Sequence, residues 1–110
     1  MNLKFGVPCS QLKDKIQDVD VFCPNEEIAF GLAAGCILCN KEPIVYTQNS
    51  GFFRSIDILV SLYIPYEIPF PSILLSIRHS PEHHKKAGQI TKPLIDLIQC
   101  YKIKIFEEQI

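Results

Sequence analysis

The sequence predicts an α/β fold in which helices flank a parallel sheet. Short β-rich runs alternate with longer segments whose apolar residues recur every three or four positions, an alternation typical of strand–helix–strand units. Two of these runs, 44–47 and 72–77, are mainly apolar, as expected of strands that are buried on both faces. The other two lie at 19–23 and 102–105. The chain of 110 residues fits a single domain, 1–110.

Composition and charge exclude several classes of function. The apolar fraction of 47% is sufficient for a core, and the net charge of −1 gives no indication of binding to nucleic acid or to an anionic membrane. No apolar run approaches the roughly 20 residues that cross a bilayer, and residues 1–4 lack the apolar character of a signal peptide. The sequence therefore predicts a cytoplasmic protein that binds neither nucleic acid nor membrane.

The stretch 23–35 joins a predicted strand directly to a predicted helix. Asn25 is expected to cap this helix, with Glu26 and Glu27 in its first turn, where acidic side chains suit the positive end of the helix dipole. Ligands of open α/β sheets bind beyond the carboxyl ends of the strands, where Glu26 would lie. Glu26 is therefore a candidate for holding or transferring a proton, although the residue type and position also fit a simple capping role.

The remaining segments predict three further helices. Ser10 would cap a short helix over 11–17, and Thr91 would cap a helix over 92–100 whose inward residues are Leu94, Ile95, Leu97 and Ile98. Between them, a helix is expected from 52 to about 63, with an apolar face of Phe53, Ile56, Val60 and Tyr63. Asn40 is expected to end the first long helix in the left-handed conformation.

Polar residues follow two of the later strands. Residues 48–51 (QNSG) combine amides, a hydroxyl and a glycine that would permit close backbone approach by a ligand. The loop 78–86 holds all three histidines together with several basic side chains. Taken alone, each segment could be an ordinary turn or a solvated loop. Their position after successive strands favours a common site.

The five cysteines are spread through apolar segments and are interpreted as buried thiols. Cys36 and Cys39 have the spacing of metal and redox sites, but they lie late in a predicted helix. No second pair exists to complete a zinc tetrahedron, so we predict no metal site in this chain.

Four strings occur in an order and at distances that resemble a known family: GVPCSQLK (6–13), NEEIAFGLAAG (25–35), QNSG (48–51) and HKKAGQIT (84–91). Together they resemble the pyrimidine-binding domain of phosphonopyruvate decarboxylase and of the sulfopyruvate decarboxylase alpha subunit, which are thiamine-diphosphate enzymes. The resemblance covers residues 5 to about 98. It implies a subunit of a 2-oxo acid decarboxylase that acts on phosphonopyruvate or sulfopyruvate and releases CO2 and the aldehyde.

The resemblance also implies roles for individual residues. Glu26 matches the glutamate that activates thiamine diphosphate through N1′ of its aminopyrimidine, and His84 matches a histidine near the substrate. Asn49, Ser50 and Gly51 match a segment that lines the cofactor. Three residues are expected to bind the substrate, whose anionic group suits basic side chains: Ser10, Arg54 and Arg78.

The sequence also departs from the family pattern. Residues 52–54 read FFR where the family has a glycine and an asparagine, and the Gly-Asp-Gly pattern that holds Mg2+ and the diphosphate is absent. The resemblance therefore implies a hetero- or homo-oligomer with a diphosphate-binding (beta-type) partner subunit. An apolar edge around Phe52, Phe53 and Tyr63 is the expected contact surface. The domain is also expected to be truncated at both ends, and the alternative function is a catalytically silent interaction module of the same fold.

Overall fold

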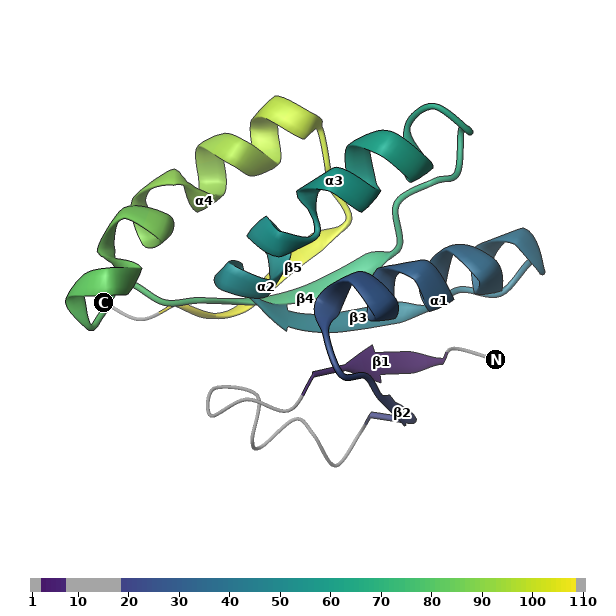
Figure 1. Ribbon diagram of the computed structural model, residues 1–110, viewed down its shortest axis with the longest axis horizontal. Coiled ribbons are helices and arrows are strands. Elements are labelled where there is room, and N and C mark those ends of the chain that lie inside the picture. Colours follow the sequence, from purple (N-terminus) through teal and green to yellow (C-terminus); the bar gives the residue numbers. More distant parts are fainter. Residues whose placement is uncertain (1–2, 8–18, 109–110) are drawn as a thin grey trace.

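The computed structural model describes residues 3–7 and 19–108, which form a parallel sheet covered by helices (Figure 1). In the described part of the chain the sheet has five strands in the order β2-β1-β3-β4-β5, and every pairing is parallel. The strands are β1 Lys4–Gly6, β2 Val21–Phe22, β3 Ile44–Gln48, β4 Ser72–Ile77 and β5 Ile103–Glu108. The predicted fold class, an α/β fold with a parallel sheet, is confirmed.

Three connections cross the same face of the sheet, because the chain moves along the sheet in one direction from β2 through β3 and β4 to β5 (Figure 1). The elements in these connections are α1 Glu26–Leu38, α2 Asn49–Arg54, α3 Ile56–Ile58 with a π-helical turn Leu59–Tyr63, a 3₁₀ turn Glu82–His84, and α4 Lys85–Ile98. The carboxyl ends of β2, β3 and β4 are each followed closely by a helix. Helix starts therefore gather at one edge of the sheet.

The core lies between the sheet and this helical layer. Its fully buried side chains come from both layers and include Phe30, Val45, Phe52, Leu59, Ile73 and Leu75. Tyr63 is also fully buried, and its hydroxyl donates a hydrogen bond to the Phe30 carbonyl oxygen. Burial, with smaller contributions from the Cys36 and Cys100 thiols, raises the pKa of Tyr63 well above its ordinary value.

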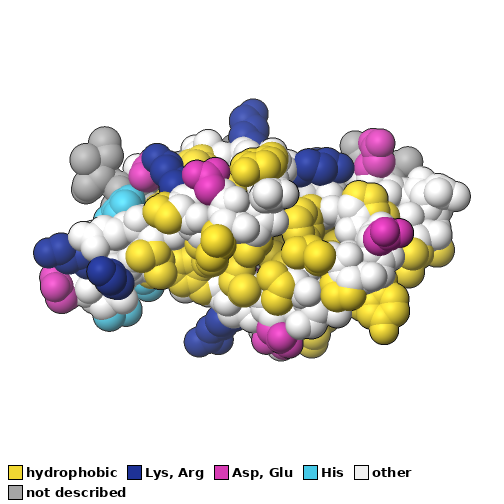
Figure 2. Space-filling view, turned by 90° about the horizontal axis from the view of Figure 1, so that it is seen from above, with side chains coloured by type: hydrophobic (Ala, Val, Ile, Leu, Met, Phe, Trp, Pro, Cys, Tyr) yellow, Lys and Arg dark blue, Asp and Glu magenta, His cyan; other side chains and the backbone are white. Residues whose placement is uncertain are grey.

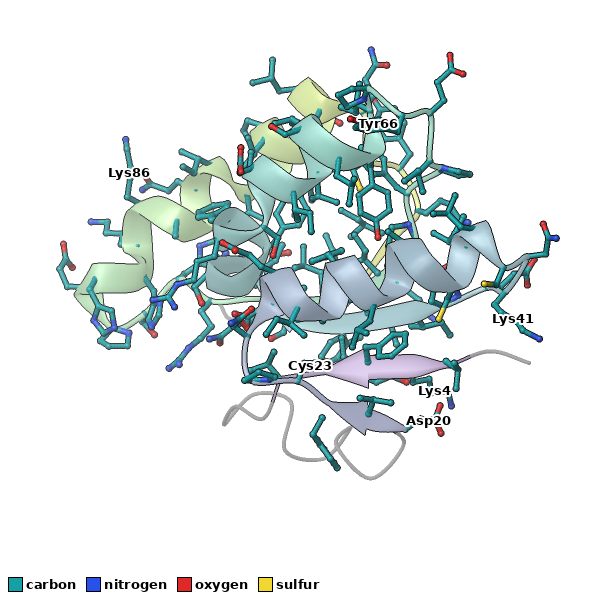
Figure 3. The ribbon with its side chains drawn as sticks, turned by 45° about the vertical axis from the view of Figure 1, so that its right-hand side comes forward. Lys4, Asp20, Cys23, Lys41, Tyr66 and Lys86 are labelled. Atoms are coloured by element: carbon teal, nitrogen blue, oxygen red, sulfur yellow. The ribbon has the colours of Figure 1, made fainter. Side chains whose placement is uncertain are left out.

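The outer surface of the helical layer is partly apolar (Figure 2). Helix α1 contributes to it, because Ile28 and Leu32 are each 44% exposed while Ala29, Phe30 and Ala33 on the other side of the helix are fully buried. At the edge of the sheet formed by β2 and β1, the Lys4 backbone N–H donates a hydrogen bond to Oδ2 of Asp20 (2.9 Å) (Figure 3). This bond connects the segment before β2 to β1.

Both predicted ends of α1 are confirmed. The Oδ1 atom of Asn25 accepts the backbone N–H of Ile28 (2.9 Å), which satisfies one of the free donors of the first turn. Asn40 has φ 61°, the left-handed conformation expected after a helix end.

The segment 48–63 differs from its prediction. Gln48 ends β3, and Asn49–Gly51 form the first turn of α2 instead of a loop. The predicted contact edge is wrong for Phe52 and Tyr63, which are fully buried, and Phe53 is partly buried. The reason is that the helix is divided at Ser55 and then widened into a π-helical turn, so the apolar residues do not follow one regular helical face.

The predicted start of α4 is also wrong. The helix begins at Lys85, seven residues before the predicted start at 92, and Thr91 lies fully buried inside it. Threonine is a favoured capping residue, and Thr91 therefore made 92 resemble a start. The inward residues are Gly88, Thr91 and Ile95, spaced at three and four, so Leu97 is turned outward and is 79% exposed.

The buried-thiol interpretation holds for two of the described cysteines. Cys23 and Cys100 are buried, Cys36 is partly buried and Cys39 is exposed. Burial raises the pKa of Cys100 to about 12 and also raises that of Cys23. Cys9, Ser10 and the predicted helix 11–17 lie outside the described residues.

None of the helices in the described part of the chain is both long and apolar enough to cross a membrane. In the same residues, histidine, cysteine and acidic side chains do not gather in groups of three that could hold a metal ion.

Candidate functional site

The side chain of Glu26 lies against Gly51, so the β2–α1 joint meets the first turn of α2. A Cβ atom at position 51 would lie 2.4 Å from Glu26 Cγ and 2.4 Å from Thr47 Oγ1, which is closer than real carbon contacts come. Only glycine permits this approach. Two residues that the sequence predicted for the site are thereby brought into contact at the carboxyl edge of the sheet.

A pocket of about 250 Å³ opens beside this contact and is lined by Asn25, Glu26, Glu27 and Arg54. Glu26 is partly buried, whereas Arg54 is exposed at the end of α2. The pocket therefore pairs a carboxyl group with a guanidinium group. Neither Phe52 nor Phe53 lines it: Phe52 points into the core, and the two rings lie 6.5 Å apart between centroids.

Asn49, one residue beyond β3, is buried and hydrogen-bonded within the chain. Its Nδ2 donates to the carbonyl oxygen of Arg78 (3.1 Å) and to Oγ1 of Thr91 (3.2 Å), and its Oδ1 accepts the backbone N–H of Arg78 (3.1 Å). Both N–H donors of the amide are thus in use. A direct contact of Asn49 with a cofactor stays a prediction. Ser50, between Asn49 and Gly51, is partly buried.

Arg78 follows β4 directly, and its side chain is partly buried. Its Nε is buried and has no hydrogen-bond partner within residues 3–7 and 19–108. The Oε1 of Gln48, at the carboxyl end of the neighbouring strand β3, is also buried and has no hydrogen-bond partner among the same residues. An unpaired donor and an unpaired acceptor therefore lie at adjacent strand ends, where each would gain a hydrogen bond from a polar ligand.

His84 ends the 3₁₀ turn before α4, and its ring lies 4.1 Å from that of His83 between centroids. Partial burial, followed by the charges of His83 and Arg78, lowers the pKa of His84 below its ordinary value of 6.5. The imidazole is therefore neutral near pH 7 and able to accept a proton.

Sequence reasoning missed several residues that shape this edge. Thr91 joins Asn49 in the core, and Glu108 at the end of β5 contacts both His79 (3.2 Å to Nε2) and Lys92 (3.0 Å to Nζ). Each pair is more than ten positions apart in the sequence, so no local pattern reveals it. Thr91 was predicted only as a helix cap, and its place at the end of the string HKKAGQIT is the signal that could have indicated a role in the site.

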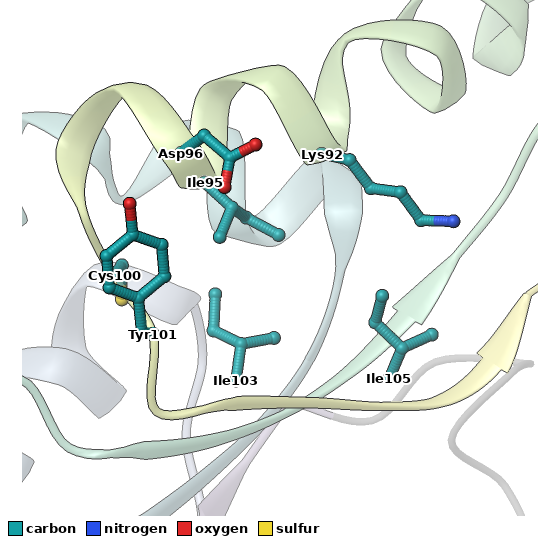
Figure 4. A pocket seen from close by; sticks show the side chains of 7 residues that line it. All are labelled: Lys92, Ile95, Asp96, Cys100, Tyr101, Ile103 and Ile105. Carbon is teal, nitrogen blue, oxygen red and sulfur yellow. The ribbon is translucent and has the colours of Figure 1, made fainter.

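A second pocket, of about 290 Å³, lies between α4 and β5 (Figure 4). Its lining is mainly apolar and comprises Lys92, Ile95, Asp96, Cys100, Tyr101, Ile103 and Ile105. None of these residues was predicted for the site, so the predicted chemistry belongs to the edge that carries Glu26 and Arg78.

Comparison with known proteins identifies relatives over 63% to 94% of the chain. No protein-family model matches it. The sulfopyruvate decarboxylase subunit alpha of Methanocaldococcus jannaschii is 32% identical over 94% of this chain and 68% of its own length. The subunits of the same name from Methanothermobacter thermautotrophicus and Methanococcus maripaludis are 37% and 33% identical over 63% and 86% of this chain.

The chain spans between about half and two thirds of the length of these relatives: 46%, 62% and 68%. The matches agree with the resemblance found in the four sequence strings. From this similarity, the chain belongs to the family of sulfopyruvate decarboxylase alpha subunits.

Proposed function

We propose that this chain is a subunit of a thiamine-diphosphate-dependent decarboxylase and that it binds the pyrimidine end of the cofactor. The observation that carries the proposal is the contact of Glu26 with Gly51 beside the pocket at the carboxyl edge of the sheet. It holds a partly buried carboxyl group beside the first turn of α2, where the same side chain also lines the pocket. The relatives' names, sulfopyruvate decarboxylase subunit alpha, support the same function.

The residues at this edge fit a polar aromatic ring. Glu26 offers carboxyl oxygens, Ser50 a partly buried hydroxyl, and Gln48 an amide oxygen that lacks a partner among the described residues. Thiamine diphosphate, when bound, supplies an electron sink for the carbanion that decarboxylation leaves. In this proposal Glu26 holds a proton toward N1′ of the aminopyrimidine, and Ser50 and Gly51 line the ring, with Asn49 in the same turn.

The substrate is proposed to be a 2-oxo acid with a second anionic group, sulfopyruvate or phosphonopyruvate, and the names of the relatives favour sulfopyruvate. Arg54 at the pocket and Arg78 with its unpartnered Nε would bind the anionic groups through charge-assisted hydrogen bonds. Ser10, which lies outside the described residues, stays a predicted third contact. His84, whose pKa is lowered, would take part in proton transfer near the reacting carbon after CO2 has left and before the aldehyde is released.

A partner subunit is part of the proposal. The relatives are named as alpha subunits, which implies at least one other kind of subunit in those enzymes. Diphosphate and Mg2+ require a set of oxygen ligands. We assign these ligands to a beta-type partner in a hetero- or homo-oligomer, with the assembled enzyme in the cytoplasm.

The test mixes the chain with a candidate partner, thiamine diphosphate, Mg2+ and each substrate, and measures CO2 release. Glu26→Gln removes the proton-holding group with little change in shape and should lower the rate by at least about 100-fold. Glu27→Gln is the matched control, because Glu27 is exposed and lines the same pocket, and it should retain most of the activity. Full activity of Glu26→Gln would remove Glu26 from the mechanism.

The alternative function, a catalytically silent interaction module, makes the opposite prediction for the same mixtures. It is favoured by one observation, that residues 52–54 read FFR where the family pattern has a glycine and an asparagine. In that case the chain binds the partner without any cofactor-dependent release of CO2.

A further inference from the structure

The side chain of Asn49 holds the backbone of Arg78 from both sides. The Arg78 carbonyl accepts from Nδ2 of Asn49 and the Arg78 N–H donates to its Oδ1, each at 3.1 Å. One amide thus replaces the neighbouring strand that would otherwise bond to the backbone just after β4. The geometry of Arg78 therefore depends on the position of Asn49.

Thr91 fixes the position of Asn49 in turn. Its Oγ1 accepts from Nδ2 of Asn49 (3.2 Å) and donates to the Ala87 carbonyl (2.6 Å), which holds the hydroxyl in one orientation. Asn49 and Thr91 are both 0% exposed. Water cannot take over bonds that are lost at this depth, so each removed partner leaves an unpaired polar atom.

Helix α4 has to lie very close to the end of β4 for this bond to form. A Cβ atom at Gly88 would lie 2.7 Å from the Arg78 carbonyl oxygen and 2.2 Å from Nδ1 of His79. Gly88 and Thr91 are three positions apart and share the inward side of α4. The glycine therefore allows the approach that brings the Thr91 hydroxyl to Asn49.

The same turn of α2 also contacts Glu26. Asn49 holds Arg78 while Gly51, two residues on, supports the side chain of Glu26. One turn of α2 thus contacts both the Glu26 side chain and the Arg78 backbone. Asn49 thereby holds the backbone from which the Arg78 side chain, with its unpartnered Nε, extends.

We propose that Asn49 and Thr91 are positioning residues that orient Arg78 for the sulfonate or phosphonate group of the substrate. A guanidinium group binds such a group in a fixed geometry, so its affinity depends on its orientation. Neither positioning residue contacts the substrate. The inference rests on the proposed function, because it takes Arg78 as the residue that receives the anionic group.

The test measures the affinity of the full 110-residue chain for 3-sulfopropionate, which has a sulfonate and a carboxylate but no reactive keto group. Arg78→Gln should weaken binding about 10-fold or more, since it removes charge-assisted hydrogen bonds. Thr91→Val should weaken it about 3- to 10-fold, the effect of one buried hydrogen-bond partner. Thr91→Ser retains the hydroxyl and should bind as the unaltered chain does.

Two further measurements separate positioning from a general loss of structure. In an Arg78→Gln background, Thr91→Val should cause no additional loss of affinity, because its effect passes through Arg78. Hydrogen exchange at the Arg78 amide should be faster in Thr91→Val and unchanged in Thr91→Ser. Thr91→Ala replaces Thr91→Val if the latter does not fold.

The outcomes that overturn the inference differ from those that overturn the proposed function. If Arg78→Gln weakens binding and Thr91→Val does not, the positioning role is wrong and the substrate contact stands. If Arg78→Gln has no effect, both the contact and its positioning are wrong, whereas the role of Glu26 is tested separately by CO2 release. If Thr91→Val weakened binding by the same factor in the unaltered chain and in the Arg78→Gln background, the positioning role would also be wrong.

Discussion

Gly51 and Gly88 both allow a helix to approach more closely than another residue would, but they meet different kinds of atoms. At Gly51 the crowded atoms belong to the side chains of Glu26 and Thr47. At Gly88 they include the Arg78 carbonyl oxygen, a backbone atom that Asn49 already holds. A side chain can rotate away, whereas the backbone of a strand end cannot. Gly51 therefore controls where a carboxyl group points, and Gly88 controls whether α4 packs at all.

The largest expected effect is on stability, in Gly88→Ala. Overpacking should lower the free energy of unfolding by about 1–3 kcal/mol, and the helix preference of alanine offsets only part of this. Gly35→Ala is the matched control, because nothing lies within 4 Å of a Cβ at that position of α1. It should be neutral or slightly stabilising. The comparison would be contradicted if thermal and urea unfolding gave the same change in the free energy of unfolding for both variants.

Gly51→Ala should affect function more than stability. The added methyl group displaces the Glu26 side chain, and the rotation limits the loss of unfolding free energy to about 1 kcal/mol. CO2 release by the assembled subunits should fall at least about 10-fold, since a carboxyl group moved by an ångström no longer meets its partner atom. A fully active Gly51→Ala would show that the contact with Glu26 is not needed.

Asn25→Ala tests how each helix start is fixed. The side chain of Asn25 caps α1, whereas the residue before α4, His84, makes no capping hydrogen bond with its side chain. Loss of the cap should cost about 1 kcal/mol of unfolding free energy, and Asn25→Asp should restore most of it. His84→Ala should leave stability nearly unchanged, which urea unfolding would check in parallel.

The smallest effect concerns Glu108, whose carboxylate joins α4 and the loop after β4 to β5. Hydrogen bonds from Lys92 and then His79 lower the pKa of Glu108 below its ordinary value of 4.5. A lowered pKa in the folded state stabilises the protein above about pH 4.5 and loses that contribution as the pH falls through the folded value. Since these side chains are partly exposed, the loss should be small.

The free energy of unfolding, measured between about pH 6 and pH 3, should therefore decline slightly less steeply with falling pH in Glu108→Gln than in the unaltered chain. Glu67→Gln, a substitution at an exposed position in the connection before β4, serves as the control. An equal or steeper decline in Glu108→Gln would show that this carboxylate does not contribute.

The sequence predicts the parts of the fold that local signals decide. The start and end of α1 follow from Asn25 and Asn40, and the buried strands follow from their apolar composition. The start of α4 has no comparable signal, since the residue before it, His84, makes no capping hydrogen bond with its side chain. The strand Lys4–Gly6 was missed because three residues are too few to show a pattern.

The residues of the candidate site likewise divide into those that local sequence signals indicate and those that only packing decides. Glu26, Gly51, Arg54 and Arg78 could be singled out by residue type and by resemblance. The bonds of Asn49 could not, because its partners lie 29 and 42 positions away. Such pairs are decided by how the helices pack on the sheet, which no window of sequence contains.

The π-helical turn at Leu59–Tyr63 has a consequence for how α1 is held. Ile64 N–H bonds to the carbonyl of Leu59, five residues back, so this turn contains one residue more than a regular α-helix requires. Deleting one residue here would restore the regular spacing and rotate Tyr63 by about 100°. Its hydroxyl would then leave the Phe30 carbonyl, and α1 would lose a hydrogen bond that helps to hold it against the neighbouring helical turn. The length of one turn, as well as the identity of any side chain, thus contributes to how the helix that begins with Glu26 is held.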